Sequence, residues 1–367
     1  MFLGVVTLVA ILLHVYPVAR LLGSAGIMST TSGALMGVAL ALVLVVLLVC
    51  GHARGLDLVG TIGDVWLGVV FQVFVWTVAG EMLRLVLWVA DVPSRGWIAS
   101  LAVIVWTVLV LAHGLRRALG PVGIVPTEVR LPRLHPDLDG LRIVQVTDTH
   151  LSRILGRSWM AGIVHQVNGI DADIYCHTGD LADGDPRLRD DGVDEIGKVH
   201  AAHKYYITGN HEYFGDALHW AERMTELGWT FLHNTHVVFR RGAGKLVIAG
   251  IDDPTGSTSG LPGHGPDLGR ALEGAPPDAA VLLLAHQPKQ ARQAAEYGAD
   301  LQLAGHTHGG QMWPFHFLVR ADQKYVAGLY AISERTQLYV SRGTGFWGPP
   351  FRIGAPPEIA LITLRCA

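Results

Sequence analysis

The sequence predicts an α/β catalytic domain that follows an all-α membrane domain of about four transmembrane helices. Two observations predict this division. Long apolar stretches are confined to the chain before residue 120, whereas after residue 140 short apolar runs alternate with segments whose apolar residues recur at helical spacing. We therefore expect a transmembrane domain over residues 1–120, a linker over 121–139 and a catalytic domain over 140–367.

The composition is too apolar for an ordinary soluble protein. Of the 367 residues 50% are hydrophobic and 16% are charged, and the mean hydropathy is +0.35. A helix needs about 20 mostly apolar residues to cross a membrane. Four stretches approach or exceed that length, and they run roughly over residues 2–22, 33–50, 65–90 and 97–115. We expect a multi-pass membrane protein in contact with the lipid bilayer.

The first apolar stretch could instead be a cleaved signal peptide. Only Met1 precedes the apolar run, and Arg20 follows it, which is the reverse of the charge order in a signal peptide. We favour a retained membrane anchor. In the third stretch Glu81 and Arg84 are three residues apart and can pair on one helical face. The pair could mark a site inside the membrane, but we favour a neutralised packing contact because nothing else polar accompanies it.

The orientation is predicted from the loop arginines. Arg54, Arg116 and Arg117 fall on one side of the four spans, and Arg20 and Arg95 fall on the other. Positively charged loops tend to stay in the cytoplasm. Three arginines on one side against two on the other predict that both termini and the catalytic domain lie on the cytoplasmic side.

The charge and the cysteines exclude two classes of protein. A net charge of -3 provides no basic surface for nucleic acid. The three cysteines, Cys50, Cys176 and Cys366, lie in a predicted span, in a predicted strand and at the C-terminus. They form no disulfide framework.

The catalytic part begins after a proline-rich linker. Pro121, Pro126, Pro132 and Pro136 resist helix continuation and central strand pairing. Beyond them, helical spacing predicts helices around residues 159–167 and 217–227, and further strands are expected over residues 245–249, 337–340 and 359–364.

Five short stretches of the catalytic part place a metal-binding side chain directly after an apolar run rich in β-branched residues. In open sheets, the points where buried strands end are where binding sites are built. One such coincidence would mean little, but five in one order predict a site for two metal ions. The stretches are Asp148-Thr149-His150, Gly179 to Gly184, Gly209 to Glu212, His286, and Gly305 to His308, and the runs before them are residues 143–146, 174–176, 205–207, 281–284 and 301–303.

The residue types suit a dinuclear centre. Asp148 and His150 are two residues apart, so in an extended chain they project from the same face and can hold one ion together. Carboxylates, imidazoles and an amide suit Mn²⁺, Fe or Zn²⁺, and the absence of cysteine disfavours a structural zinc site. Two neighbouring cations need a bridging anion, for which Asp180 is the candidate. Gly179, Gly209 and Gly305 leave room for tight turns.

The order Asp-x-His, Gly-Asp-x-x-Asp, Gly-Asn-His-Glu, a lone His and Gly-His-x-His resembles the calcineurin-like metallophosphoesterase superfamily. The resemblance covers roughly residues 140–367. The stretches from Gly305 to Gln311 and from Ser341 to Gly345 are further similar to its membrane-anchored bacterial group. The resemblance implies a four-layer αββα sandwich with the metals at the loops along the sheet edge.

The resemblance also implies a role for each site residue. His211 would be the general acid or a donor to the transition state, Glu212 would orient it, and Asp183 would lie behind the ligands rather than among them. Asp148, His150 and His308 would hold the first metal, Asn210, His286 and His306 the second, and Asp180 would bridge the two.

These residues predict the hydrolysis of a phosphoester or pyrophosphate. A hydroxide activated by two cations can attack phosphorus in line, and His211 can protonate the departing oxygen. Because four spans hold the site near a bilayer, we expect a membrane-associated or lipid-linked phosphorylated substrate. Two alternatives stay open: a broad phosphatase or phosphodiesterase on nucleotides or phosphoproteins, and a membrane sensor that binds metal without turnover. The intact ligand and acid set argues against the sensor.

Some conspicuous residues are given no catalytic role. Thirteen of the 18 histidines, His233 among them, lie outside the motifs and are expected to be surface or satisfied core residues. Asp252 and Asp253 fit a turn before Pro254 at least as well as a place in the site. The aromatic loops over residues 313–317 and 346–351 could form an apolar lip for an acyl chain, but we favour ordinary packing.

Overall fold

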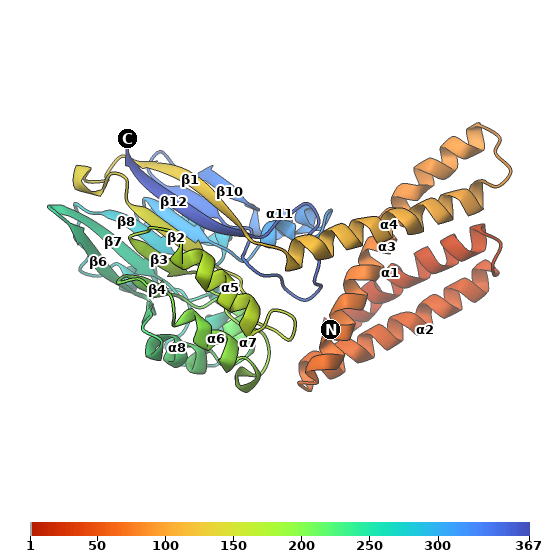
Figure 1. The fold of residues 1–367 in the computed structure, drawn as a ribbon, viewed down its shortest axis with the longest axis horizontal. Coiled ribbons are helices and arrows are strands. Elements are labelled where there is room, and N and C mark those ends of the chain that lie inside the picture. Colours follow the sequence, from red (N-terminus) through yellow and green to blue (C-terminus); the bar gives the residue numbers. More distant parts are fainter. Residues whose placement is uncertain (1) are drawn as a thin grey trace. The chain divides into compact units, whose positions relative to one another are not determined.

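The computed structural model describes residues 2–367, which form two compact units (Figure 1). A helical unit contains the chain up to Leu119 together with Gly348–Ile353. A sandwich unit contains Gly120–Trp347 and Gly354–Ala367. The chain thus leaves the sandwich once, just after Trp347, and re-enters it at Gly354.

The helical unit has four helices long and apolar enough to cross a membrane, as predicted. Three of them begin earlier than predicted, the fourth by only two residues. The second is capped by Ser29, whose Oγ accepts a hydrogen bond from the backbone N–H of Ser32 at 3.0 Å, and the third begins with an acidic residue in its first turn. The helices are α1 (Phe2–Ser24), α2 (Thr30–Leu48), which continues into a short π-helix η1 (Val49–Ala53), α3 (Asp57–Val89) and α4 (Arg95–Leu119).

Glu81 and Arg84 pair as predicted, with 2.5 Å between Oε1 and Nη1. The expectation that no other polar group accompanies them was wrong. Arg20 of α1 donates to both carboxylate oxygens of Glu81, at 2.8 and 2.6 Å. Ser100 of α4 accepts from Arg84 at 3.0 Å. These partners come from helices that are distant in the sequence, so the third stretch alone could not reveal them.

The segment Gly348–Ile353 packs within the helical unit. The backbone N–H of Arg352 donates to the carbonyl of Gly114 in α4 at 3.0 Å. A Cβ built on Gly68 in α3 would lie 2.7 Å from the ring of Phe351, which is 5% exposed. Phe351 is therefore a packing residue of this unit.

The sandwich unit contains two six-stranded mixed sheets. Both combine parallel and antiparallel neighbours, and their central strands run parallel. In spatial order the first sheet is β1 (Gly123–Leu131), β12 (Glu358–Cys366), β2 (Arg142–Val146), β3 (Ile174–His177), β4 (Lys204–Tyr206) and β5 (Thr230–Phe231), and the second is β10 (Gly328–Ala331), β11 (Gln337–Val340), β9 (Leu301–Ala304), β8 (Ala280–Leu284), β7 (Gly244–Gly250) and β6 (Thr235–Arg241).

Side-chain alternation along the strands builds four layers. Ile143 of β2 and Leu282 of β8 share the core between the two sheets. Their neighbours Val144 and Leu283 point the other way, into separate outer cores. Helices cover both outer faces, which confirms the αββα sandwich. They are α5 (Arg157–Asn168), α6 (Asp190–Ile196) and α8 (Ala217–Glu226) against the first sheet, and α9 (Leu268–Ala271) and α10 (Ala291–Glu296) against the second.

The remaining helices are short and lie in loops. The α-helices among them are α7 (Asn210–Phe214) and α11 (His316–Gln323), and the 3-10 turns are η2 (Pro136–Leu138), η3 (Pro186–Leu188), η4 (Pro254–Thr258), η5 (Pro288–Gln290) and η6 (His308–Gly310).

The segment expected to be a linker contains strand β1. It pairs in parallel with β12, with Pro126 opposite Leu361. β1 is the edge strand of its sheet, and proline is tolerated there because one side of the strand needs no hydrogen-bond donors. The proline-rich sequence thus excluded a central strand but was compatible with this one.

Candidate metal centre

The predicted site residues follow the ends of five strands. Asp148 and His150 follow β2, Asp180 follows β3, and Asn210 follows β4 in the first sheet. In the second sheet His286 follows β8, and His306 and His308 follow β9. Neighbouring parallel strands end at the same edge of a sheet, so these loops gather in one place.

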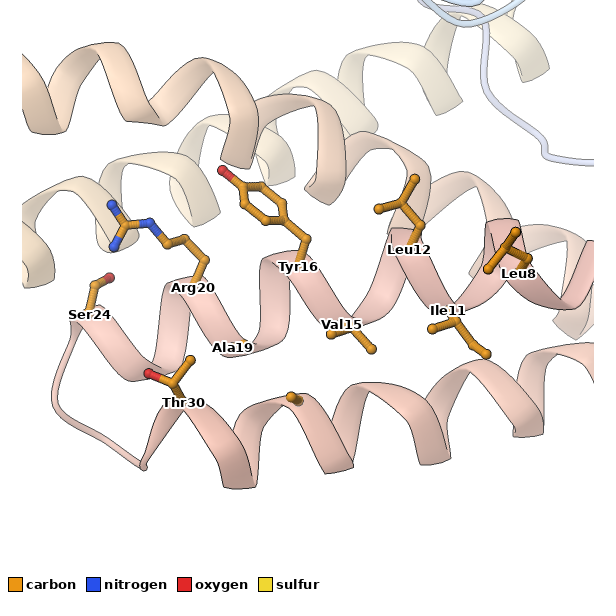
Figure 2. A pocket seen from close by; sticks show the side chains of 10 residues that line it. Leu8, Ile11, Leu12, Val15, Tyr16, Ala19, Arg20, Ser24 and Thr30 are labelled. Atoms are coloured by element: carbon orange, nitrogen blue, oxygen red, sulfur yellow. The ribbon is translucent and has the colours of Figure 1, made fainter.

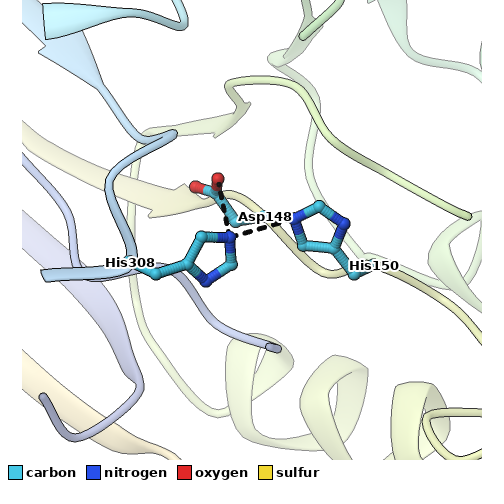
Figure 3. Close-up of side chains that lie close together, drawn as sticks. All are labelled: Asp148, His150 and His308. Carbon is cyan, nitrogen blue, oxygen red and sulfur yellow. Dashed lines mark hydrogen bonds and ion pairs between the residues drawn. The ribbon is translucent and has the colours of Figure 1, made fainter. Parts of the chain in front are cut away.

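The first group contains Asp148, His150 and His308, all buried (Figure 3). The Nε2 atoms of the two imidazoles are 3.0 Å apart. Nε2 of His308 lies 3.4 Å from Oδ1 of Asp148. These are the three residues expected to hold the first metal.

The second group contains Asp180, His286 and His306. Nε2 of His286 lies 3.2 Å from Oδ2 of Asp180. Oδ1 of Asn210 lies 2.8 Å from Nδ1 of His306, so the amide joins the same group.

Asp180 connects the two groups. Its Oδ2 is 3.5 Å from Nε2 of His150 and 3.2 Å from Nε2 of His286. Its Oδ1 accepts the backbone N–H of His211 at 2.9 Å. One carboxylate oxygen therefore faces both groups while the other is fixed by the backbone.

The unpaired atoms of the site fit divalent cations. In the described part of the chain, Oδ2 of Asp148 and Nε2 of His286 are buried without a hydrogen-bond partner. An unsatisfied buried polar atom costs about 1–3 kcal/mol, which a cation at this place would offset. Burial and the neighbouring charge of Asp180 also raise the pKa of Asp148. The carboxylates of Asp148 and Asp180 repel each other when both are ionised, so positive charge between them is needed to keep both in that form.

The backbone at these loops is strained. Five candidate ligands have positive φ values, a region that side chains other than glycine rarely adopt. Such strain persists only where surrounding structure enforces it, and it concentrates at functional sites. The residues are Asp148 (52°), His150 (42°), Asp180 (54°), His306 (69°) and His308 (50°).

His211 lies in the first turn of α7, beside the candidate ligands. Its Nδ1 lies 2.7 Å from Oδ1 of Asp183, and its ring centroid is 4.6 Å from that of His150. Burial lowers the pKa of His211, but the carboxylates of Asp180 and Asp183 outweigh it and raise the pKa to about 9. Asp183 thus stabilises the protonated imidazole of His211. Bound cations would instead lower the pKa of His211.

The contacts of Glu212 differ from those expected of a residue that orients His211. The hydrogen bonds of its carboxylate go to backbone N–H groups, to Asp180 at 3.0 Å, Leu181 at 2.6 Å and Gly209 at 2.5 Å. The residue that orients His211 is Asp183, which also lies 2.9 Å from Nδ1 of His150. Glu212 sits in the first turn of α7, where its side chain turns back onto the loop backbone.

Comparisons with known proteins point to one family. The model of the calcineurin-like phosphoesterase family matches residues 141–310. A transmembrane protein with metallophosphoesterase domain of Danio rerio is 38% identical over 75% of this chain and 65% of its own length. An uncharacterized metallophosphoesterase of Campylobacter jejuni is 32% identical over 80% of this chain and 79% of its own. Another, of Bacillus subtilis, is 31% identical over 69% and 90%.

This chain belongs to the calcineurin-like phosphoesterase family. It spans 65% and 62% of the length of the Danio rerio relative and of a Bos taurus relative of the same name.

Aromatic side chains flank His211 in this member of the family. The rings of Phe214 and Trp347 lie 5.3 and 6.2 Å from the imidazole and are 69% and 47% exposed. Gln311 fixes Trp347 by accepting its backbone N–H at 3.0 Å and donating to its carbonyl at 2.7 Å. The sequence singled out Trp347 but not Phe214, whose position two residues beyond Glu212 was the available signal. Phe346, by contrast, is buried.

One further histidine cluster of the phosphoesterase domain was not predicted. His233, Asp252 and His264 lie close together, with Nδ1 of His233 2.8 Å from Oδ1 of Asp252. Oδ2 of Asp252 accepts the backbone N–H of Gly265, and Nδ1 of His264 lies 3.0 Å from the hydroxyl of Tyr213. These contacts tie the loop after β7 to α7. Asp253 caps η4 by accepting the backbone N–H of Thr255, which is the turn role, one of the two roles considered for it.

Proposed function

We propose that this protein hydrolyses a phosphoester or pyrophosphate bond of a membrane-associated or lipid-linked substrate and depends on two divalent metal ions. One observation carries the proposal: carboxylates, imidazoles and an amide from five strand-end loops converge on one buried place, and two of their atoms have no hydrogen-bond partner among the described residues. Membership of the phosphoesterase family supports the reaction class. The metals are Mn, Fe or Zn.

The roles follow from the positions of the side chains. Two divalent ions, when bound, supply charge stabilisation and activate the attacking water. Asp148, His150 and His308 would hold one ion, Asn210, His286 and His306 the other, and Asp180 both.

His211 would donate the proton that the leaving oxygen needs. Its Nδ1 faces Asp183, so the transferable proton is on Nε2. Asp183 keeps the imidazole protonated and in one orientation, and Glu212 holds the loops after β3 and β4 together. Proton donation by a positioned side chain contributes about 10²- to 10⁴-fold to the rate.

Two observations support a lipid-linked substrate. Four helices can cross a membrane, and relatives carry the name transmembrane protein. Phe214 and Trp347 expose apolar rings beside His211, where the leaving group would lie. Arg54, Arg116 and Arg117 would lie on the cytoplasmic side of the membrane, which would place the catalytic domain in the cytoplasm. The membrane domain would comprise residues 1–120.

The test is hydrolysis by the full chain in detergent, loaded with Mn²⁺ or Zn²⁺, against lipid-linked pyrophosphates, cyclic dinucleotides and aryl phosphates. We expect turnover of lipid-linked substrates and a loss of at least 100-fold in the variants Asp180→Asn and His211→Ala. The exposed Asp171→Asn and His200→Ala are the matched controls and should keep full activity. Full activity of Asp180→Asn would refute the proposal.

The substrate class has a separate test. Phe214→Ser and Trp347→Ser should weaken turnover of lipid-linked substrates and leave an aryl phosphate unaffected. Phe317→Ser removes an equally exposed ring that has no contact with His211, and it should change neither. Equal losses on both substrates would argue against a lipid-linked substrate while leaving the hydrolytic assignment intact.

A further inference from the structure

The polar cluster inside the helical unit leaves one buried cation incompletely satisfied. Arg84 is 6% exposed. Its terminal nitrogens reach Glu81, Ser24 and Ser100, but its Nε is buried without a hydrogen-bond partner in the described part of the chain. A charged group held in a membrane segment is costly and marks a functional site by default.

A cavity of about 500 Å³ at this cluster carries an excess of positive charge. Three arginines, Arg20, Arg84 and Arg95, line it against one carboxylate, Glu81. Glu81 is already shared by Arg20 and Arg84. Among residues 2–367, Arg95 forms no ion pair, and it is exposed at the start of α4. The cavity therefore complements an anion.

The lining of the cavity fits the level of a membrane interface. Trp88 and Pro93, at the end of α3 and in the turn to α4, complete its lining. Tryptophan favours the depth of the lipid headgroups. Arg95 begins the next helix at the same end.

An apolar groove of about 560 Å³ runs from the same place between α1 and α2 (Figure 2). Arg20 and Ser24 line both the groove and the cavity. Figure 2 shows these two polar side chains at one end of α1, with Leu8 and Leu12 at the other. From Leu8 to Arg20 the helix rises about 18 Å, close to the depth of one leaflet of a bilayer about 30 Å thick.

We propose that the helical unit binds a phospholipid with an anionic phosphate headgroup. The phosphate occupies the cavity beside Arg20, Arg84 and Arg95, and one acyl chain lies along the groove of α1 and α2. Arginine suits phosphate because its planar group presents several donors at once. Basic pockets between membrane helices recognise anionic headgroups in this way. This site is separate from the metal centre, and the proposal does not depend on catalysis.

The test compares lipid binding to the full chain, purified in detergent, by native mass spectrometry. The probes are phosphatidylglycerol and phosphatidylcholine with identical chains, and inorganic phosphate. We expect phosphatidylglycerol to be retained in preference to phosphatidylcholine. Inorganic phosphate at equal concentration should not displace it, because it lacks the chain.

Variants distinguish binding at this site from general electrostatic attraction between the protein and anionic lipid. Arg95→Gln should weaken phosphatidylglycerol binding about fivefold, whereas Arg54→Gln, an exposed loop arginine outside the cavity lining, should leave it unchanged. Ala34→Trp, which fills the groove, should weaken binding of the lipid. Equal retention of the two lipids, equal binding by Arg95→Gln and the native chain, or displacement by inorganic phosphate would each overturn the proposal.

Discussion

At the scale of single residues, the candidate metal centre depends on backbone that comes unusually close to the proposed ligands. A Cβ on Gly305 would lie 2.1 Å from Oδ2 of Asp148, and one on Gly209 would lie 2.2 Å from Oδ1 of Asp180. A side chain at either position would collide with a candidate ligand, so both positions require glycine. Both glycines could be recognised from the sequence as turn residues, but the close approach could not.

Gly305→Ala should therefore displace Asp148 and reduce bound metal. We expect a loss of about 10- to 100-fold in metal affinity, comparable to the loss of a residue that supports a ligand, measured by metal titration of the chelated protein. Gly162→Ala in α5, where a Cβ meets nothing within 4 Å, is the control. Normal affinity in Gly305→Ala would show that Asp148 is not a ligand.

Asp183 should act through His211. Removing its charge in Asp183→Asn lowers the pKa of His211, because the imidazolium loses a partner that raises that pKa. If the imidazolium is the acid, activity falls as pH rises through this pKa, so the alkaline limb of the pH profile should move to lower pH and kcat should fall about 10- to 100-fold. An unmoved alkaline limb would contradict this role.

At the scale of elements, the strand ends could be predicted because buried strands carry short, β-branched apolar runs. The hydrogen-bond partners of Glu212 could not be predicted, since they depend on how the chain turns into α7. The position of Phe214 beside His211 depends on the same turn, and this residue was missed. The first helix pair follows the rule that small residues let membrane helices approach closely: a Cβ on Gly37 of α2 would lie 2.6 Å from Cα of Val15 in α1.

Gly37→Leu should separate α1 from α2 and destabilise the helical unit by about 1–3 kcal/mol, the usual cost of overpacking. The measurement is the fraction of monodisperse protein that survives heating in detergent. Gly4→Leu adds the same side chain where nothing lies within 4 Å and should be tolerated. Equal survival of the two variants would count against close packing of α1 and α2.

At the scale of the whole molecule, hydropathy could separate the apolar helices from the rest of the chain because lipid and water favour different amino-acid compositions. The return of Gly348–Ile353 to the helical unit was not predictable. Its glycines and prolines carry no periodic pattern. Packing was the favoured interpretation of Phe351, but the sequence could not indicate which unit the residue packs in.

Metal removal should destabilise the sandwich unit. Without cations, Asp148 and Asp180 repel each other in a buried place. Ligand present at 100 times its Kd stabilises a protein by about 2.7 kcal/mol, so chelation should lower the melting temperature by roughly 5–10 °C. Calorimetry with and without a chelator checks this, and restoration by Mn²⁺ or Zn²⁺ excludes an effect of the chelator itself. An unchanged melting temperature would argue against resident metal.

The most direct test of the proposed two-metal hydrolysis is the metal content of the purified full chain, measured by elemental mass spectrometry alongside its hydrolytic activity. Two divalent ions per chain are predicted, with a lower content and at least 100-fold less activity in Asp180→Asn and the native content and activity in Asp171→Asn. A native chain that hydrolyses phosphoesters with no bound divalent ion, or an Asp180→Asn variant with full metal and full activity, would contradict the account.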